Sequence, residues 1–265
     1  MIRGLYTSAW SMLALTKQMD VVSNNLANVD TTAFKKDTVV FESFPDTLMK
    51  SLAYLGNGSS SIGSMSMGSD VGEVYTYFSQ GTIQNTGNNL DFALQDGISS
   101  TSTQTNNNSF FTVGVSGDNG QTQEYYTRDG AFALNSQNQL VTKDGYTVLG
   151  ESGPITLKVG DFSVAADGTI SQNGAVAGKL LLKSFQNSTD LRKLGSNLFQ
   201  TIPGAQEIPF NATVMQGSLE QSNVNIIKEM IDMITVTRSY EASQKILQAQ
   251  DGTLEKAVNE IGSMR

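Results

Sequence analysis

The sequence predicts an α+β protein in which helices at the two ends of the chain pair as a coiled-coil domain and an antiparallel β-rich domain is inserted between them. Apolar residues recur at coiled-coil spacing near the N-terminus, and a second such stripe runs toward the C-terminus. Between them lie short β-branched and aromatic runs separated by turn dipeptides. The expected division is a helical domain of residues 1–35 and 218–265, a Gly/Ser-rich linker at 36–70 and a β-rich domain at 71–217.

The first helix is expected between about residues 2 and 28, where apolar side chains repeat every seven residues with a second set three residues later. This spacing is typical of helices that pack along a narrow seam, and Ser8 is its one polar position. At 1.5 Å per residue the helix would be roughly 40 Å long. Its expected packing residues are Leu5, Met12, Leu15, Met19, Val22 and Leu26.

The helix ends in a polar stretch, SNNLANVDTTAF, from Ser23 to Phe34. Asparagine tolerates the backbone conformations that end helices, and its side chain forms local turns. We therefore expect a signature turn that directs the chain out of the helical domain toward the β domain. Its residues are Asn25, Asn28, Thr31, Ala33 and Phe34.

The segment that follows is expected to connect the helical and β parts. Its stretch GNGSSSIGSMSMGS at 56–69 is rich in Gly and Ser and offers little to bury, which is typical of a mobile linker. A second polar tract, SSTSTQTNNNS at 99–109, is expected to be an exposed loop.

The middle of the chain is expected to form antiparallel strands. Runs such as SFFTVGV at 109–115 and GKLLLKSF at 178–185 combine β-branched and aromatic residues. Between the runs lie dipeptides that accept the positive φ angles of hairpin turns. These dipeptides are Asp129-Gly130, Asp144-Gly145, Asp167-Gly168 and Asn173-Gly174.

A second helical stripe begins near Ile226 and continues to the C-terminus in steps of four and three. Asn223 or Asn225 is placed to cap its first turn. Because narrow seams lie at both ends of the chain, we expect the two helices to pack with each other or with other copies. The expected packing residues of this second helix are Ile226, Met230, Met233, Ile234, Tyr240, Leu247, Leu254 and Val258.

The composition excludes several function classes. The 17 basic residues are scattered and outnumbered by 25 acidic ones, and the net charge of −8 argues against nucleic-acid binding. The chain has no Cys and no His, so it lacks thiolate ligands, thiolate nucleophiles and the commonest general base. No apolar run is long enough for a membrane span, and the N-terminus lacks the pattern of a cleavable signal.

Pairs of carboxylates are the remaining catalytic candidates. Asp91 with Asp96, or Asp118 with Glu124, would suit a glycosidase at the right separation. Acidic residues in Gly-rich loops are far more often turn formers, and the sequence contains no phosphate loop, dinucleotide fingerprint or complete calcium loop. We therefore expect no enzyme activity, no catalytic or metal-binding residues and no cofactor.

These features resemble the flagellar basal-body rod and hook family over essentially the whole chain. The signature turn matches the family's Ser-x-Asn-Leu-Ala-Asn and Thr-x-Gly-Phe motifs, except that Ala33 replaces the usual glycine. QGSLEQSNV at 216–224, RSYE at 238–241 and QGTIQNTGNNLDFAL at 80–94 match further family segments. Alanine at this position implies a turn that either avoids positive φ or carries strain. The tract at 99–109 looks like an insertion.

The resemblance implies a structural subunit of the bacterial flagellar basal-body rod, which is the axial drive shaft that transmits torque from motor to hook. In such rods the terminal helices form an inner tube and the β domain lies outside. The implied partners are copies of the chain itself, other rod and hook proteins in a helical lattice, the flagellar type III export apparatus and the surrounding envelope rings. The implied location is the basal body within the cell envelope and periplasm, reached without a cleaved signal peptide.

Within this family the sequence leaves two members open. GYTVLGESGPITL at 145–157 is more similar to the proximal-rod member. MIRGLY at 1–6 and SNVNIIKEMIDMI at 222–234 are equally similar to the distal-rod member.

Two other functions fit parts of the sequence. Arg128-Asp129-Gly130 and the tract at 99–109 would suit a secreted adhesin or carbohydrate-binding β protein, although the apolar alternation around the tripeptide favours a hairpin there. A glycosidase acting on cell-wall polymer during rod growth would use the carboxylate pairs. Only the rod interpretation accounts for both helical seams.

Overall fold

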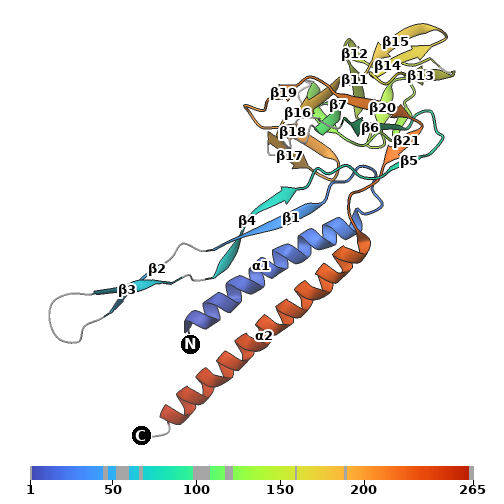
Figure 1. Ribbon diagram of the computed structural model, residues 1–265. Coiled ribbons are helices and arrows are strands. Elements are labelled where there is room, and N and C mark those ends of the chain that lie inside the picture. The colour runs from blue at the N-terminus through green and yellow to red at the C-terminus, as the bar shows by residue number, and fades with distance from the viewer. Residues whose placement is uncertain are drawn as a thin grey trace. The chain divides into compact units, whose positions relative to one another are not determined.

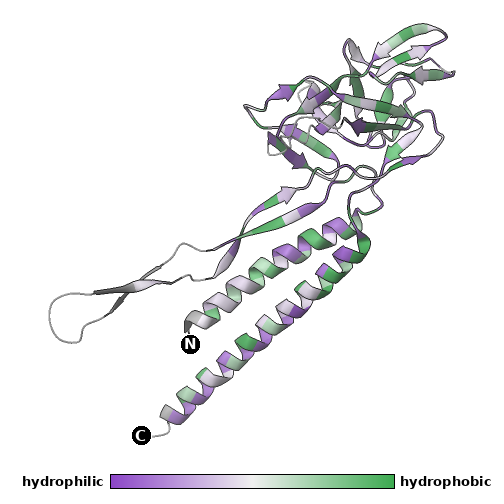
Figure 2. Ribbon diagram, viewed as in Figure 1, coloured by the Kyte–Doolittle hydropathy of each residue, from purple (hydrophilic) through white to green (hydrophobic). Residues whose placement is uncertain are grey.

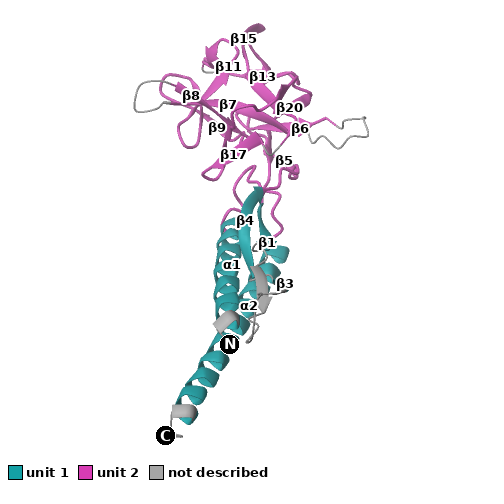
Figure 3. Cartoon of the chain, turned by 90° about the vertical axis from the view of Figure 1, so that its left-hand side faces the viewer, with its two compact units in different colours: residues 1–26, 37–75, 226–265 teal, residues 27–36, 76–225 magenta. Residues whose placement is uncertain are grey.

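The computed structural model (Figure 1) consists of two compact units, which Figure 3 colours separately. The helical unit comprises Met1–Leu26, Asp37–Tyr75 and Ile226–Arg265, and the β unit comprises Ala27–Lys36 and Thr76–Asn225. Two terminal helices and a large antiparallel β region confirm the predicted α+β class. The structure describes residues 2–43, 47–51, 60–65, 68–97, 108–116, 122–158, 160–187 and 190–262.

The helical unit contains α1 (Ile2–Ala27) and α2 (Ile226–Gly262), which lie side by side in Figures 1 and 3. They run antiparallel, because Gly4 lies against Gln250 near one end and Asn25 donates to Glu229 near the other. Along α2 the hydroxyl groups of Ser and Thr bond back to carbonyls one turn earlier, as Thr237 does to Met233, so they add no unpaired donors to the helix surface. Within the described residues, neither helix combines the length and apolar character that a membrane crossing requires.

Paired strands occupy the described part of the segment that was expected to be a linker. β1 (Asp37–Ser43) pairs with β4 (Ser69–Thr76), and β2 (Thr47–Ser51) pairs antiparallel with β3 (Ser60–Met65). The linker was expected because this stretch has few apolar side chains to bury. Strand pairing, however, is made by backbone groups and does not require apolar side chains. Residues 44–46, 52–59 and 66–67, which the linker prediction also covered, lie outside the described residues.

A ten-stranded antiparallel sheet forms the main part of the β unit. Its strands follow the order β17-β18-β8-β7-β11-β10-β9, with β12 beside β11, β16 beside β7 and β19 beside β16. Their bounds are β7 (Asn108–Ser116), β8 (Thr122–Thr127), β9 (Phe132–Leu134), β10 (Leu140–Thr142), β11 (Thr147–Gly150), β12 (Gly153–Pro154), β16 (Leu182–Phe185), β17 (Leu191–Leu194), β18 (Leu198–Thr201) and β19 (Glu207–Ile208).

Three smaller sheets complete the β unit. One contains β13 (Phe162–Val164), β14 (Thr169–Gln172) and β15 (Ala175–Lys179). The others pair β20 (Ala212–Gln216) with β6 (Phe92–Asp96) and β21 (Ser218–Glu220) with β5 (Ile83–Asn85).

Strand β7 lies between two apolar clusters of the β unit. Successive side chains of a strand point to opposite faces, so Phe110 joins one cluster and Phe111 the other. Phe111 packs edge-on against Phe132 with ring centroids 5.2 Å apart, and Phe110 packs against Phe199 at 5.5 Å. The buried aromatic rings hold the strands on which the charged groups described below are mounted.

Three of the four predicted hairpin turns are confirmed. Asp144-Gly145 joins the paired strands β10 and β11, Asp167-Gly168 joins β13 and β14, and Asn173-Gly174 joins β14 and β15. The hairpin predicted at Asp129-Gly130 is wrong, because β8 pairs with β7 and β9 pairs with β10. Gly130 instead passes so close to another strand that a Cβ there would lie 1.8 Å from the carbonyl oxygen of Phe92.

Candidate functional site at the signature turn

Asn25 joins three elements of the helical unit. Its side chain is 1% exposed, and its Oδ1 accepts from the N–H of Asp37 at 3.0 Å. Its Nδ2 donates to the carbonyl of Asp37 at 2.8 Å and to the Glu229 carboxylate at 3.2 Å. A single buried amide therefore ties the last turn of α1 to the start of β1 and the first turn of α2.

The rest of the signature forms a compact turn in the β unit. Thr31 donates to Asn28 twice, from its N–H to the carbonyl at 3.1 Å and from its hydroxyl to Oδ1 at 3.2 Å. Thr32 donates its hydroxyl to Asp129 at 2.7 Å, and the Phe34 N–H donates to the Thr31 carbonyl at 3.3 Å. After α1 the chain therefore turns through backbone bonds that span three residues, and a bond between the side chains of Thr31 and Asn28 reinforces the first of these.

Ala33 adopts the left-handed conformation that the resemblance associates with glycine. Its φ is 57°, its side chain is 2% exposed, and its N–H donates to the carbonyl of Glu220 at 2.8 Å. The turn therefore does not avoid positive φ, and alanine carries the strain there.

We expect Ala33→Gly to leave the free energy of unfolding of the β unit within about 1 kcal/mol of the natural value, because relief of roughly 1 kcal/mol of backbone strain offsets the loss of a buried methyl worth about 0.8 kcal/mol. Ala33→Val is expected to cost about 2–4 kcal/mol, since a branched side chain is both strained and overpacked there. Urea denaturation of both variants measures the difference. Equal destabilisation by the two substitutions would contradict the strain argument.

Phe34 is fully buried directly after the strained residue. The ammonium of Lys193 lies 3.8 Å from the centroid of the Phe34 ring and also donates to the carbonyl of Lys35 at 3.0 Å. The ring is therefore held both by packing and by a cation–π contact.

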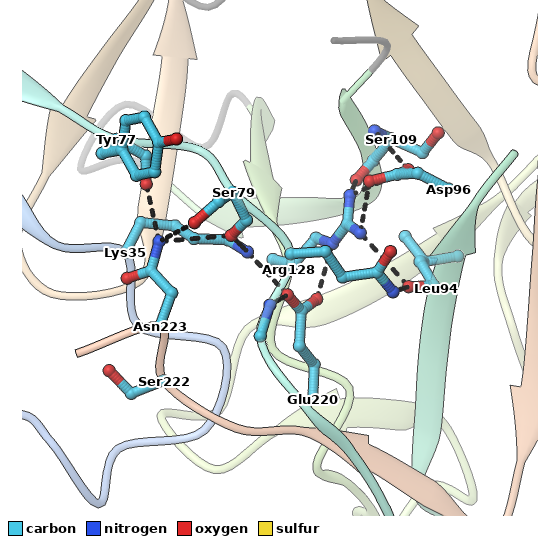
Figure 4. A network of polar contacts seen from close by, with 12 residues as sticks. Lys35, Tyr77, Ser79, Leu94, Asp96, Ser109, Arg128, Glu220, Ser222 and Asn223 are labelled. Atoms are coloured by element: carbon cyan, nitrogen blue, oxygen red, sulfur yellow. Dashed lines mark hydrogen bonds and ion pairs between the residues drawn. The ribbon is translucent and has the colours of Figure 1, made fainter. Parts of the chain in front are cut away.

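Four charged residues form a buried group in the β unit, here called the ionic cluster: Lys35, Asp96, Arg128 and Glu220 (Figure 4). The side chains of Lys35, Arg128 and Glu220 are 2% exposed or less, whereas that of Asp96 is 19% exposed. Two positive and two negative charges balance within the cluster.

Glu220 lies at the centre of the ionic cluster. Its Oε1 accepts from the Lys35 ammonium at 2.6 Å and from the Gly81 N–H at 2.7 Å, and its Oε2 accepts from Nε of Arg128 at 2.7 Å. A Cβ at residue 81 would lie 1.9 Å from the carbonyl oxygen of Gln221, so only glycine brings its N–H to this position.

Every N–H group of the Arg128 guanidinium donates a hydrogen bond. Besides its bond to Glu220, it donates to both carboxylate oxygens of Asp96, at 3.1 and 2.6 Å. It also donates to the carbonyls of Ser109 at 2.7 Å and Leu94 at 3.2 Å. A buried arginine with every donor satisfied cannot serve as the exposed cation of an adhesive tripeptide.

Charge partners determine the direction of the pKa shifts of Glu220 and Arg128, whereas burial lowers the pKa of Lys35 despite the nearby Glu220. Burial alone would raise the pKa of Glu220, but the charges of Arg128 and Lys35 outweigh it and hold that pKa below its ordinary value. Burial would lower the pKa of Arg128, but Glu220 and Asp96 raise it above the ordinary value. The geometry therefore fixes Glu220 as a carboxylate between two cations.

Asn223 connects the signature turn to the segment before β5. Its Oδ1 accepts from the Lys36 N–H at 2.8 Å, and its Nδ2 donates to the carbonyls of Tyr77 at 2.8 Å and Ser79 at 3.2 Å. One of the two alternatives predicted Asn223 as the N-cap of α2. Asn223 does not cap this helix, because its side-chain amide bonds to the backbone of Lys36, Tyr77 and Ser79. Asn225 is the residue directly before the helix.

A cavity of about 650 Å³ lies beside the turn in the β unit. Its walls come from the signature turn, the β10–β11 turn and the β17–β18 turn, and include Asp30, Asp129, Lys143, Asp144 and Asn197. Among the described residues no group of three or more acidic side chains has the arrangement of a metal site.

Of the carboxylates considered for catalysis, Asp91 and Asp96 have structural roles, and Glu124 is exposed on β8. Asp91 accepts from the Thr86 hydroxyl at 2.6 Å and from the Asn88 amide at 3.1 Å, and Asp96 binds Arg128. Asp118 and residues 99–107 of the polar tract lie outside the described residues.

The structure places the predicted packing residues of α1 mainly on its inner side. Val22 is buried, and the other five are half-buried. The buried residues of this helix also include Ala14 and Asn25. A small and a polar residue thus occupy inner positions that a search for large apolar side chains passes over.

The predicted stripe of α2 divides into two sets. Met233, Tyr240, Leu247 and Leu254 are half-buried, whereas Ile226, Met230, Ile234 and Val258 are exposed. The fully buried positions of α2 are Glu229 and Val236. Near the start of α2, Asn25 fixes Glu229 on the inner side, so the next residue, Met230, is exposed. The ribbon of these first turns is largely green in Figure 2, so apolar periodicity alone does not single out the inner face there.

Comparison with known proteins finds three flagellar family models, which match successive parts of the chain. The model described as "Flagella basal body rod protein" matches residues 5–35, "Flagellar hook protein FlgE/F/G D1 domain" matches 105–177, and "Flagellar basal body rod FlgEFG protein C-terminal" matches 215–260. The flagellar hook-basal body complex protein FlhO of Bacillus subtilis is 32% identical over 100% of both chains.

The chain belongs to the flagellar basal-body rod protein family. Other relatives are the flagellar basal-body rod protein FlgF of Rhizobium meliloti, 31% identical over 99% of both chains, and FlgG of Bacillus subtilis, 32% identical over 98% of this chain and 99% of the relative. These names describe rod proteins of the basal body. They favour the rod interpretation over the adhesin and glycosidase alternatives.

The ionic cluster of this rod-family protein was missed by the sequence reasoning. Lys35 directly follows the signature turn and Glu220 lies within the segment QGSLEQSNV at 216–224, which is the only local signal of their importance. No periodicity relates Glu220 to Arg128, which is 92 residues away in sequence. The cluster joins the signature turn, the β sheet and the strand that leads back to α2, all within the β unit.

Proposed function

We propose that the protein is a structural subunit of the flagellar basal-body rod that polymerises into the axial drive shaft and transmits torque from motor to hook. Full-length similarity to rod proteins, with both terminal signatures present, carries the proposal. α1 and α2 would pair as a coiled coil within and between subunits and form the inner tube, with the β unit outside. This role requires interlocking surfaces and no active site.

The proposed partners are copies of the chain, other rod and hook proteins, the flagellar export apparatus and the envelope rings around the rod. The proposed location is the basal body in the periplasmic part of the envelope, reached through the export channel without cleavage of a signal peptide. The absence of cysteine suits a chain that crosses to an oxidising compartment. Proximal and distal positions in the rod are both compatible with the relatives named above.

Deletion of the gene and complementation test the function. We expect the deletion strain to be non-motile and to lack hooks, and hook–basal bodies isolated from the complemented strain to contain the chain in its full length. Normal swimming of the deletion strain, or absence of the chain from purified basal bodies, would contradict the proposal.

A further inference from the structure

An aliphatic patch lies on the outer face of the first turns of α2. It consists of Ile227, Met230, Ile231 and Ile234, which are 70%, 50%, 57% and 54% exposed. Their spacing of three, four and seven residues places them on one face of the helix. Fully burying side chains of this size is worth about 1.5–3 kcal/mol each, so this face favours an apolar partner.

A second patch, the aromatic patch, lies on α1. Tyr6, Trp10 and Leu13 are 56%, 38% and 48% exposed, and their spacing of four and seven residues again defines one face. Farther along this face the exposed residues are Lys17 and Asp20, so the apolar surface is confined to the first turns of α1.

The two patches lie at opposite ends of the helix pair. Gly4 lies beside Gln250, and Asn25 lies beside Glu229. In each pair the residue numbers add up to 254, as expected for antiparallel helices. Residue 10 of α1 is therefore level with about residue 244 of α2. The aliphatic patch is centred about 14 residues before that level. At 1.5 Å per residue the two patches are offset by roughly 20 Å along the helix axis.

Because of this offset, the two patches of one copy do not face each other. We infer that the aliphatic patch of one copy packs against the aromatic patch of the next copy, which is displaced by roughly 20 Å along the helix axis. This inference rests on the proposed function and specifies which surfaces of neighbouring copies meet. Each copy uses both patches once, so the contact is heterologous and continues from copy to copy, whereas pairing of like patches about a two-fold axis would stop at a dimer.

Thiol crosslinking within assembled rods tests the inference, because the natural chain contains no Cys. The test variant carries Trp10→Cys and Ile231→Cys, which the offset brings together between copies. The matched control carries Trp10→Cys and Lys245→Cys. Lys245 is exposed, lies 14 residues after Ile231 and is nearly level with Trp10, so this pair would meet only if copies lay side by side without an offset. A third variant carries Trp10→Cys alone and reports contact between like patches. Isolated hook–basal bodies are treated with a short bis-maleimide.

We expect the first variant to give a ladder of covalent dimers and higher oligomers, and the other two variants to remain mostly monomeric under denaturing electrophoresis. A ladder from the control pair, or dimers from Trp10→Cys alone, would overturn the inferred contact. If all three variants are present in the basal bodies but none crosslinks, this inference fails while the proposed function stands. Absence of the natural chain from the basal bodies would instead overturn the function.

Discussion

Glu220→Gln is expected to destabilise the β unit by about 3–5 kcal/mol, which is a large share of the roughly 5–15 kcal/mol that a typical domain has. The substitution preserves shape but removes one of two negative charges from the ionic cluster. Of the three ion pairs in the cluster only that of Arg128 with Asp96 then remains, so the positive charge of Lys35 stays buried without its counter-ion. Urea denaturation followed by circular dichroism measures the loss.

Two further variants separate this effect from a general loss of a carboxylate. Glu151→Gln breaks an ion pair with Lys179, in which the side chains of Glu151 and Lys179 are 55% and 42% exposed, and it is expected to leave the stability nearly unchanged. Combining Lys35→Met with Glu220→Gln restores the charge balance, so the double variant is expected to lose less stability than Glu220→Gln alone. Equal losses for the buried and exposed carboxylates would contradict the role assigned to the cluster.

The pH dependence supplies a second readout of the same cluster. The pKa of Glu220 is lower in the folded protein than in the unfolded chain, so its contribution to stability is complete above the unfolded pKa of about 4.3 and is lost as the pH falls through the folded pKa. Glu220→Gln lacks this component. Its stability should therefore fall less steeply than that of the natural protein below about pH 4.3.

Replacing both Met230 and Ile234 by Asp is expected to abolish motility while leaving both units folded. The two side chains are 50% and 54% exposed, so the substitutions remove little internal packing. In an assembled rod, however, they would bring two carboxylates into an apolar contact, which costs several kcal/mol at every subunit contact. Swimming in soft agar and the yield of hook–basal bodies measure the effect.

The matched control replaces both Gln244 and Gln248 by Asp. These two residues have the same four-residue spacing as Met230 and Ile234 and lie 14 residues farther along α2. Both are exposed, and the double substitution adds the same charge to a polar part of the surface. This control strain is expected to swim. If the Met230 and Ile234 variant swims normally, the assembly role proposed for this face of α2 is wrong.

The signature turn illustrates how far local sequence reasoning reached. The asparagines were expected to end the helix. Asn28 does take part in the turn, whereas Asn25 lies in the last turn of α1 and bonds to Asp37 and Glu229. The sequence left two backbone conformations open for Ala33. The structure shows the left-handed one, in which the Ala33 N–H donates to the carbonyl of Glu220 on β21, a strand distant in sequence. Nothing near residue 33 in sequence specifies that partner.

The hairpin expected at Asp129-Gly130 is absent because partners distant in sequence again decide the local conformation. The dipeptide has the composition of a tight turn, but Arg128 is drawn inward by Glu220 and Asp96, and the next strand pairs elsewhere. The inner face of α2 likewise depends on Asn25 holding Glu229, because apolar periodicity alone fits more than one face of its first turns.

The sequence by itself determined the α+β class, the two terminal helices, three of the four predicted hairpin turns and the family, because these depend on periodicity, turn chemistry and motif order along the chain. The tertiary structure decided the pairing of strands in residues 37–76, the left-handed Ala33, the face that α2 turns inward and the ionic cluster of Lys35, Asp96, Arg128 and Glu220. Each of these depends on contacts between segments distant in sequence, where backbone pairing and the need to neutralise buried charge outweigh local preference.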